Sequence, residues 1–582
     1  MAGAWAGLRQ EAGPTWLWIG VLLGVALVFW GLLYQPYLLP NSDFYRIQEM
    51  AELLATGQFP QDFKQMPLVP LLIASVAWVL PIQENVYLHA ISVLNIALSL
   101  GSLVLLYFLA RVFLGGLLAL IPVLLLLATP QFTVSALQPM LEPTIGFFTL
   151  ATLLALAYRP RWAYVFAGLC ALARYELAVL LAVVFIVQVY REPALWFRTG
   201  LLCTLAGLPF LVWFGLSLLV APEGNPYLGE MVRASVGSVV WNKLYSFPTP
   251  TLMMAFIGLG ATLGVAAAFV RAPSVALGVV AFFVLYTAAH YVYGRPLDRY
   301  GYAVLWVLPL FVTVAFHVLF LWGRTVVERL GPWAIALAAG ALAIAASYLI
   351  ARALSGLQGS FASVDVAPGG LAAPVWYLGW SVVLAALIVL VVAISAWRAR
   401  RVAALGSLAA VAIVVMPMLA GSGALANRVT AVFYDKAELV VTLEWLKDHL
   451  EADAAVVLPR YHEPLDGMRG IGSERVVRYS DFTSADHQEF KRDLDERGVG
   501  YAVFLHRPER PVDTSNPLYS RNLHDYWASR TDLMDPFRAG GEVAGFELVA
   551  TLPPPHPVQN HATYVYRRIA ADTVDDQEER ND

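Results

Sequence analysis

The sequence contains little charge and almost no cysteine. Charged residues make up 14% of the 582 residues and hydrophobic residues 59%, whereas about a quarter of the residues in a soluble domain are charged. The mean hydropathy is +0.64. Both cysteines, Cys170 and Cys203, lie inside apolar runs, which excludes a disulfide-based scaffold. A chain of this composition is predicted to fold mostly within a membrane.

Common signatures of nucleotide, metal and nucleic-acid binding are also missing. The sequence has no P-loop, no G-x-G-x-x-G after a strand and no G-x-S-x-G hydrolase elbow. The histidines are dispersed without H-E-x-x-H spacing, so we predict no metal ligand set. With a net charge of −4 and no long basic run, the chain gives no reason to expect a nucleic-acid partner.

Apolar windows fill residues 1–430, which we predict to be the transmembrane domain. A spanning helix needs about 20 mostly apolar residues, and about thirteen windows of this kind are present. The apolar segment from Pro67 to Pro81 is too short and is bounded by prolines, so we predict a helix lying at the membrane surface. The windows are 15–34, 86–110, 113–130, 141–158, 162–173, 177–190, 199–221, 249–270, 274–290, 302–322, 332–351, 373–396 and 404–424.

Basic residues in the loops predict the orientation, because Lys and Arg concentrate on the cytoplasmic side. With the N-terminus inside, the longer outer loops hold most of the acids, among them Asp43, Glu142 and Glu176. An odd number of spans then places the C-terminal domain outside. The arginines of the short inner loops are Arg111, Arg159, Arg161, Arg191, Arg198, Arg271, Arg324, Arg329, Arg398, Arg400 and Arg401.

Residues 431–570 have ordinary charge and are predicted to form a small extracytoplasmic α/β domain. A helix is expected from Asp435, which has capping-box spacing with Glu438, and residues 571–582 are expected to be a disordered acidic tail. The fold class is thus a polytopic α-helical membrane protein with a C-terminal α/β domain. The other expected elements are a strand at 454–458, a helix at 484–497 ending at Gly498, and strands at 501–505, 546–552 and 563–566.

The first outer loop, predicted over 35–85, is long and charged. It carries Asn-Ser-Asp-Phe-Tyr-Arg at 41–46, followed by a predicted amphipathic helix. One interpretation is structural: one of the first three residues caps this helix and Arg46 is solvated. Capping does not explain why the loop continues through Lys64 into a surface-lying apolar segment. We therefore treat the loop as a candidate site.

The order of these motifs resembles that of the GT-C superfamily of membrane glycosyltransferases, in the branch of the protein O-mannosyltransferases and the lipid A aminoarabinose transferase. That branch often has Asp-Glu in the first loop, where this chain has Asp43-Phe44, so Asp43 is the sole candidate base. The family's RY…LP segment is similar to Asp298-Arg299-Tyr300 before Leu308-Pro309. The other matching positions are Ala51, Leu54, Gly57, Pro67-Leu68, Glu142-Pro143 and the stretch from Gly168 to Glu176.

The resemblance implies an inverting transferase of the inner membrane, which moves a sugar from a polyprenyl phosphate to a lipid, glycan or protein acceptor outside the cytoplasm. Asp43 is expected to take the proton of the acceptor hydroxyl. Arg46 and Lys64 are expected near the donor phosphate. Some members of the superfamily use a divalent cation, and the sequence leaves that cofactor open.

Other charged residues at the outer ends of spans have two interpretations each. Arg295, Arg299 and Tyr300 are candidates for donor contacts. An interfacial aromatic belt would explain the tyrosines of this loop but not its two arginines. Glu142 is either an acceptor or sugar contact or a plain interfacial carboxylate. Arg174 and Glu176 are also candidate contacts. Because residues two apart do not face each other on a helix, we predict that this pair lies at a break between spans.

Two rival classes of function are open at this point. A transporter or lipid flippase needs charged or broken helices near the middle of the membrane, whereas here the charges gather at the outer ends of spans. A simple anchor for the C-terminal domain needs one span and no charged loop. Convergence of Asp43, Arg46 and Glu142 on one outward cavity would favour the enzyme over both.

Overall fold

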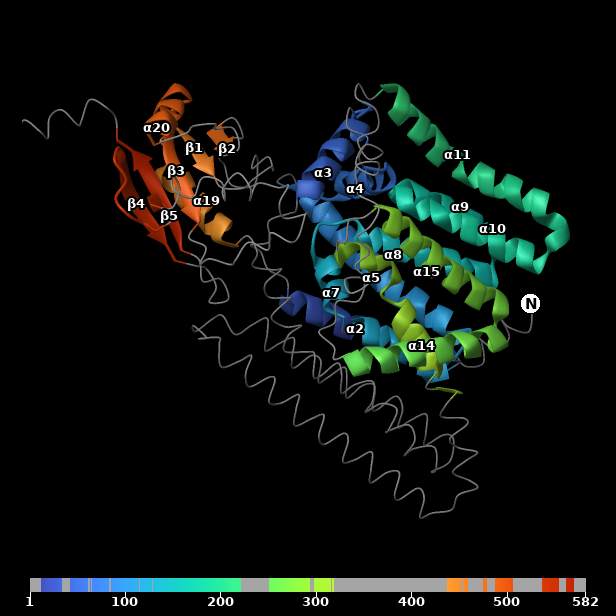
Figure 1. Cartoon of the computed structure of the whole chain (residues 1–582). Coiled ribbons are helices and arrows are strands. Elements are labelled where there is room, and N and C mark those ends of the chain that lie inside the picture. The colour runs from blue at the N-terminus through green and yellow to red at the C-terminus, as the bar shows by residue number, and fades with distance from the viewer. Residues whose placement is uncertain are drawn as a thin grey trace, which may run out of the picture. The chain divides into compact units, whose positions relative to one another are not determined.

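The computed structural model describes the chain as two compact units, one helical and one α/β (Figure 1). The predicted domain boundary at 430, the last three predicted spans and the acidic tail lie outside the described residues. The described residues are 12–33, 42–318, 437–458, 475–478, 487–505, 536–553 and 562–569, with gaps at 61–62, 64, 83–84, 115, 128, 221–250, 294–297, 316, 452–453 and 538.

The helical unit contains helices at the predicted windows as far as residue 318. Among the described residues, two helices are long and apolar enough to cross a bilayer, Val86–Arg111 and Pro193–Leu219. The total number of spans and their placement in a membrane stay predictions. The elements are α2 (Ala12–Leu33), α3 (Ser42–Ala55), α4 (Leu68–Val79), α5 (Val86–Arg111), η1 (Gly116–Ala119), α6 (Leu120–Leu127), α7 (Pro130–Leu137), α8 (Glu142–Tyr158), α9 (Pro160–Ala173), η2 (Tyr175–Ala178), α10 (Val179–Arg191), η3 (Pro193–Leu195), α11 (Trp196–Val220), α14 (Thr251–Arg271), α15 (Pro273–Tyr293) and η4 (Asp298–Val304).

Prolines set several of the helix boundaries. Pro130, Pro160, Pro193 and Pro273 are each the first residue of a helix. Proline suits this position because its fixed φ matches the helix and its missing N–H would have no partner in the first turn. The starts of these helices can therefore be predicted from the sequence.

The window at 113–130 differs from the single span predicted there. It contains η1 and the eight-residue α6, and α7 then begins at Pro130. Eight residues rise by only about 12 Å, which is less than the apolar thickness of about 30 Å. Every residue of α6 is buried. A uniformly apolar window does not distinguish a buried core helix from a lipid-facing span.

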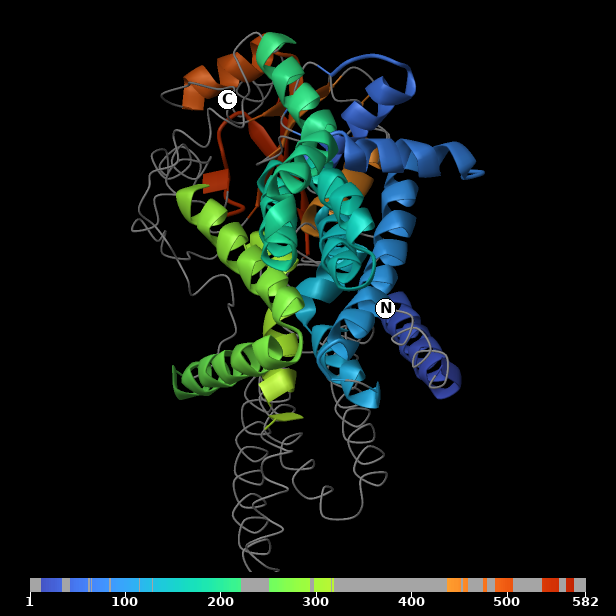
Figure 2. The same cartoon turned by 90° about the vertical axis from the view of Figure 1, so that its right-hand side faces the viewer.

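Helix α4 has the short length predicted for a surface helix. It lies across α5 rather than alongside it (Figure 2). Leu68, Val69, Pro70 and Ile73 are buried, whereas the side chain of Trp78 is 88% exposed. Contact of this exposed end with lipid head groups stays a prediction.

The α/β unit is a five-stranded sheet with a helix on each face. Its strand order is β2-β1-β3-β5-β4, with β2, β1 and β3 parallel and β5 antiparallel to both β3 and β4. The predicted strands are found within a few residues, but β2 was not predicted because three residues are too few to show alternation. The bounds are α19 (Ala437–His449), β1 (Ala455–Leu458), β2 (Val476–Arg478), α20 (His487–Glu496), β3 (Val499–Leu505), β4 (Phe546–Leu552) and β5 (Thr563–Arg568).

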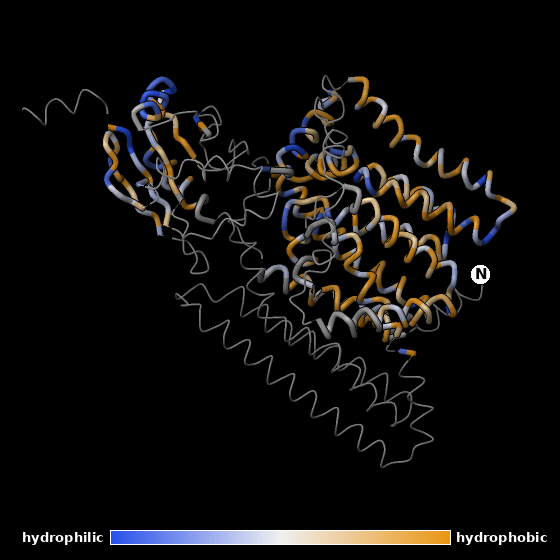
Figure 3. Tube along the Cα trace, in the orientation of Figure 1, coloured by the Kyte–Doolittle hydropathy of each residue, from blue (hydrophilic) through white to orange (hydrophobic). Residues whose placement is uncertain are grey.

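The side chains of β3 point alternately to the two faces of the sheet, so this strand contributes to the core on both faces. Tyr501 and Val503 belong to the same core cluster as Leu443 and Leu446 of α19. The intervening residues Ala502 and Phe504 belong to the other cluster, which includes Phe490 and Leu494 of α20. The remaining surface of α20 is hydrophilic, in contrast to the long hydrophobic stretches of the helical unit (Figure 3).

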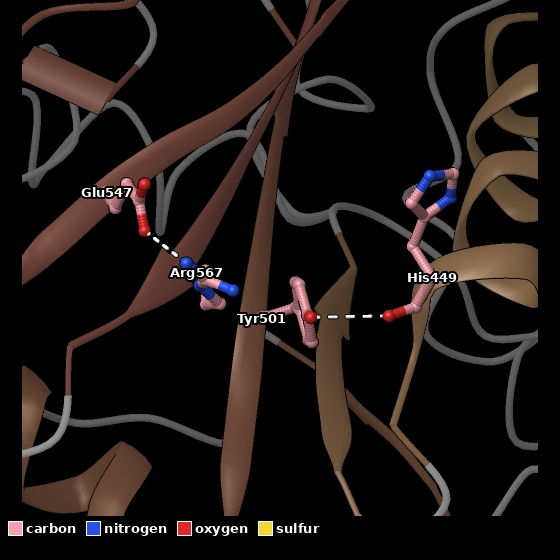
Figure 4. Close-up of polar contacts among 4 residues, drawn as sticks. All are labelled: His449, Tyr501, Glu547 and Arg567. Atoms are coloured by element: carbon pink, nitrogen blue, oxygen red, sulfur yellow. Dashed lines mark hydrogen bonds and ion pairs between the residues drawn. The ribbon is translucent and has the colours of Figure 1, made fainter.

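Two polar contacts join neighbouring elements of this unit. The Tyr501 hydroxyl donates to the carbonyl oxygen of His449 at 3.3 Å, and Arg567 pairs with Glu547 of the neighbouring strand at 2.6 Å (Figure 4). Gly498 has φ +63° and ends α20 as predicted, since glycine adopts left-handed backbone without strain. These contacts stabilise the sheet.

Candidate functional site

The predicted amphipathic helix of the first outer loop is present as α3. Asp43 is its second residue, and Arg46 is exposed one turn later, so both lie on neighbouring positions of one helix face. The helix ends before Gly57, which has φ +73°. Lys64 and Arg295 lie outside the described residues, as do the side chains of Asp43, Arg299 and Tyr300. Convergence of Asp43 with Arg46 and Glu142 therefore stays a prediction.

Arg174 and Glu176 lie at a break between helices, as predicted. Arg174 follows the last residue of α9 and has extended backbone, with φ −162° and ψ 140°. Because the chain leaves the helix there, the two side chains can meet, and Arg174 Nε lies 3.1 Å from Glu176 Oε2. Their side chains are 12% and 5% exposed. Each charge is thus compensated by the other in a mostly buried setting.

Glu142 is buried within the helical unit. It is the first residue of α8 and only 2% exposed. Tyr302 of η4 lies close to Ser99 of α5, and Glu142 is near enough for its charge to act on the Tyr302 phenol. The Tyr302 ring covers Gly146, where a Cβ atom would lie 2.8 Å from Tyr302 Cε1. We refer to Asn95, Ser99, Glu142 and Tyr302 as the buried polar cluster.

Asn95 holds the turn that leads into Glu142. Its Nδ2 donates to the carbonyl oxygens of Gln138 and Met140 at 2.7 and 2.8 Å. Sequence reasoning missed Asn95, Ser99 and Tyr302. A signal was available for the first two, because two polar residues four apart in an apolar helix share a face and polar groups inside a membrane are costly unless they are used.

Replacing Asn95 with leucine is expected to lower the thermal unfolding midpoint of the purified protein. The change removes both amide N–H donors. The Gln138 carbonyl oxygen keeps the Met140 backbone N–H at 2.8 Å, whereas the Met140 carbonyl oxygen loses the Asn95 donor, and an unsatisfied buried acceptor costs about 1–3 kcal/mol. Ser92→Ala is the matched control, because Ser92 donates only to Leu88 within its own helix. Equal midpoints for the two variants would show that Asn95 does not hold the turn.

Among the described residues, no group of three or more His, Cys, Asp or Glu side chains is arranged to hold a metal ion. The candidate side chains that the structure describes are carboxylates and guanidinium cations. One exposed cation lies on α3 beside the candidate base, and one carboxylate is buried in the polar cluster at the start of α8.

Comparison with known proteins identifies the fold. No protein-family model and no curated protein sequence matches the chain. The crystal structure of ArnT from Cupriavidus metallidurans bound to undecaprenyl phosphate matches with a TM-score of 0.52 and 17% identity, over 94% of this chain and 98% of that chain. The apo structure of ArnT matches with a TM-score of 0.52 and 18% identity, over 95% and 98%.

An oligosaccharyltransferase from Archaeoglobus fulgidus also aligns, with a TM-score of 0.46 and 10% identity over 94% of this chain and 73% of that chain. The fold assignment rests on the two ArnT structures. ArnT is the lipid A aminoarabinose transferase, a GT-C enzyme. The chain therefore has the fold of the GT-C membrane glycosyltransferases.

Proposed function

We propose that the protein is an inverting glycosyltransferase that moves one sugar from a polyprenyl phosphate to an acceptor outside the cytoplasm. The observation that carries this proposal is the alignment with ArnT in its undecaprenyl-phosphate-bound form, which covers 98% of ArnT and 94% of this chain. A shared fold over nearly the whole length favours a shared class of lipid carrier. The acceptor is a lipid, a glycan or a protein.

The proposed reaction is a single displacement. An acceptor hydroxyl oxygen forms a bond to the anomeric carbon as the bond from that carbon to the phosphate oxygen breaks. Asp43 accepts the hydroxyl proton, and the polyprenyl phosphate leaves with the bonding electron pair. Arg46 and Lys64 supply positive charge for the phosphate, and attack from the face opposite the leaving group inverts the anomeric centre.

The remaining candidates have different roles in the proposal. Arg295, Arg299 and Tyr300 are proposed to contact the donor phosphate or sugar. Glu142 is proposed to bind a sugar or acceptor hydroxyl, since a buried carboxylate among hydroxyl groups accepts such hydrogen bonds. Arg174 and Glu176 pair with each other, so we assign them a structural role at the edge of the site.

We further propose an inner-membrane location with a cytoplasmic N-terminus and an extracytoplasmic α/β unit. Exposed aromatic rings support an interface at the inner ends of α9 and α11, where Trp162, Trp196 and Phe197 are 57%, 59% and 69% exposed. Arg161 and Arg198 adjoin them in the sequence. Aromatic rings and arginines together are typical of the cytoplasmic membrane surface.

Two of the arginines behind the orientation prediction also have structural partners. Arg191 donates to the Leu156 carbonyl oxygen at 2.6 Å and to Ser274 Oγ at 2.8 Å, and Arg271 donates to the carbonyl oxygen of Phe113. Cations at helix C-termini are favourable because carbonyl groups there have no partner within the helix. Arg191 thus binds the last turn of α8, and Arg271 binds the segment that follows α5, in addition to the role in orientation that we propose for both.

The test is sugar transfer by the purified wild-type protein in lipid bilayers. A panel of radiolabelled polyprenyl-phosphate sugars and a parallel panel of nucleotide sugars are supplied with membrane extract as acceptor. We expect label to move to the acceptor from a polyprenyl-phosphate donor only. Transfer from nucleotide sugars, or transbilayer movement of the donor without transfer, would overturn the proposal, and the second result would favour a flippase.

A further inference from the structure

The loop between α3 and α4 is fixed by side chains from distant parts of the helical unit. Phe63 is fully buried and packs with Met50, Met66 and Trp213, which we call the anchor cluster. The ring centroids of Phe63 and Trp213 are 5.2 Å apart. Trp213 belongs to α11, so an apolar residue of the outer loop is held between α3 and a helix 150 residues away in sequence.

Tyr175 adds a polar contact at the same point. Its hydroxyl donates to the backbone carbonyl oxygen of Phe63 at 2.9 Å. The Tyr175 ring packs edge-on against Phe210 and Phe214 of α11, with centroids 6.1 and 6.0 Å apart. The ring is therefore oriented by α11 while its hydroxyl holds the loop.

The break between α9 and α10 is what makes this reach possible. Tyr175 stands between Arg174 and Glu176, whose side chains form the 3.1 Å ion pair. The pair closes over one residue and stabilises the turn from extended backbone at Arg174 into η2. In a continuous helix, the direction of the Tyr175 side chain would be set by helix periodicity. The break is therefore what allows this side chain to reach the loop.

We propose that Tyr175 is a positioning residue that holds Phe63 of the α3–α4 loop, and through it α3, in the geometry needed for sugar transfer. This inference rests on the proposed function, because α3 carries the proposed base Asp43. A loop without fixed points has many conformations. The contacts of the Phe63 side chain and of its carbonyl oxygen give this loop two fixed points. Small displacements of a catalytic group reduce rates strongly, by about 10²-fold for 1 Å.

The test compares Tyr175→Phe with Tyr164→Phe in the full-length protein. The first change removes the hydroxyl that binds the loop and keeps the ring. The second removes a hydroxyl of α9 that lies close to Thr199 of α11. Phe63→Leu is a second test variant, since it loosens the anchor cluster but keeps the backbone carbonyl. Amide hydrogen exchange over 57–67 and kcat at saturating donor are measured below the unfolding midpoint of each variant.

We expect Tyr175→Phe and Phe63→Leu to raise hydrogen exchange over 57–67, and Tyr175→Phe to lower kcat about fivefold, as expected for one hydrogen bond. Tyr164→Phe should change neither. A residue that acts only on overall stability leaves the kcat of folded molecules unchanged. Unaltered exchange over 57–67, or faster exchange with unchanged kcat, would overturn the proposal. If the wild type transfers no sugar, the proposed function fails, and the exchange measurement still decides whether Tyr175 holds the loop.

Discussion

Replacing Asp43 with asparagine is expected to reduce sugar transfer by about 10²- to 10⁴-fold, the usual contribution of a general base. Asparagine has the same shape as aspartate but cannot accept the proton of the acceptor hydroxyl. Asp43 is the second residue of α3 rather than its cap, so the change removes only the favourable interaction of a negative charge with the helix N-terminus, about 0.3–1 kcal/mol, and α3 should stay folded. The variant thereby separates the two interpretations of the first-loop motif, because a purely structural role predicts unaltered transfer.

The measurement is transfer of radiolabelled sugar by purified Asp43→Asn beside the wild type, with matched circular dichroism and unfolding midpoints. Glu49→Gln is the control, since Glu49 is an exposed carboxylate on the same helix. It should transfer sugar at the wild-type rate. Equal rates for Asp43→Asn and the wild type would rule out Asp43 as the base and direct attention to Glu142.

Replacing Gly168 with alanine is expected to destabilise the helical unit strongly, although it adds only one methyl group. A Cβ atom at this position would lie 2.4 Å from the carbonyl oxygen of Ala206 and 3.2 Å from its carbonyl carbon. The obstacle is backbone of α11, which cannot rotate away like a side chain. Helices α9 and α11 would have to separate, and overpacking of this kind costs about 1–3 kcal/mol or more.

Gly215→Ala is the matched control on α11. Nothing lies within 4 Å of a Cβ atom at Gly215, and alanine favours a helix over glycine by about 1 kcal/mol. We expect Gly168→Ala to lower the unfolding midpoint and the yield of monodisperse protein, and Gly215→Ala to leave both unchanged or slightly improved. Similar midpoints for the two variants would show that the α9–α11 contact tolerates an added methyl group.

The structure gives a physical reason for the glycine and the charges of the stretch from Gly168 to Glu176. The stretch from Gly168 to Glu176 matched the family pattern without a reason for its glycine or its charges. Small residues at helix interfaces allow two backbones to approach closely, and the structure supplies this reason through Ala206. It likewise shows that Arg174 and Glu176 pair across a helix break, which the spacing alone predicted only as a break.

The sequence by itself determined the positions of most described helices and the alternation in the α/β unit, whereas the membrane class of the chain stays a prediction. These features depend on local properties, namely apolar length, prolines at helix starts, and the period of two in β3. Asp43 and Arg46 were placed on one helix for the same reason. The strand β2 and the interrupted window around α6 were not recovered, because short or uniformly apolar segments carry no periodic signal.

Only the tertiary structure decided which distant segments meet. Asn95 binds a turn 43 to 45 residues away, Tyr175 binds a carbonyl group 112 residues away, and Gly168 meets Ala206 on another helix. Glu142 is a charge at a helix start in the sequence, but its burial depends on Tyr302 and α5. A local pattern specifies the face that a helix presents, whereas the partner of that face is chosen by packing of the whole unit.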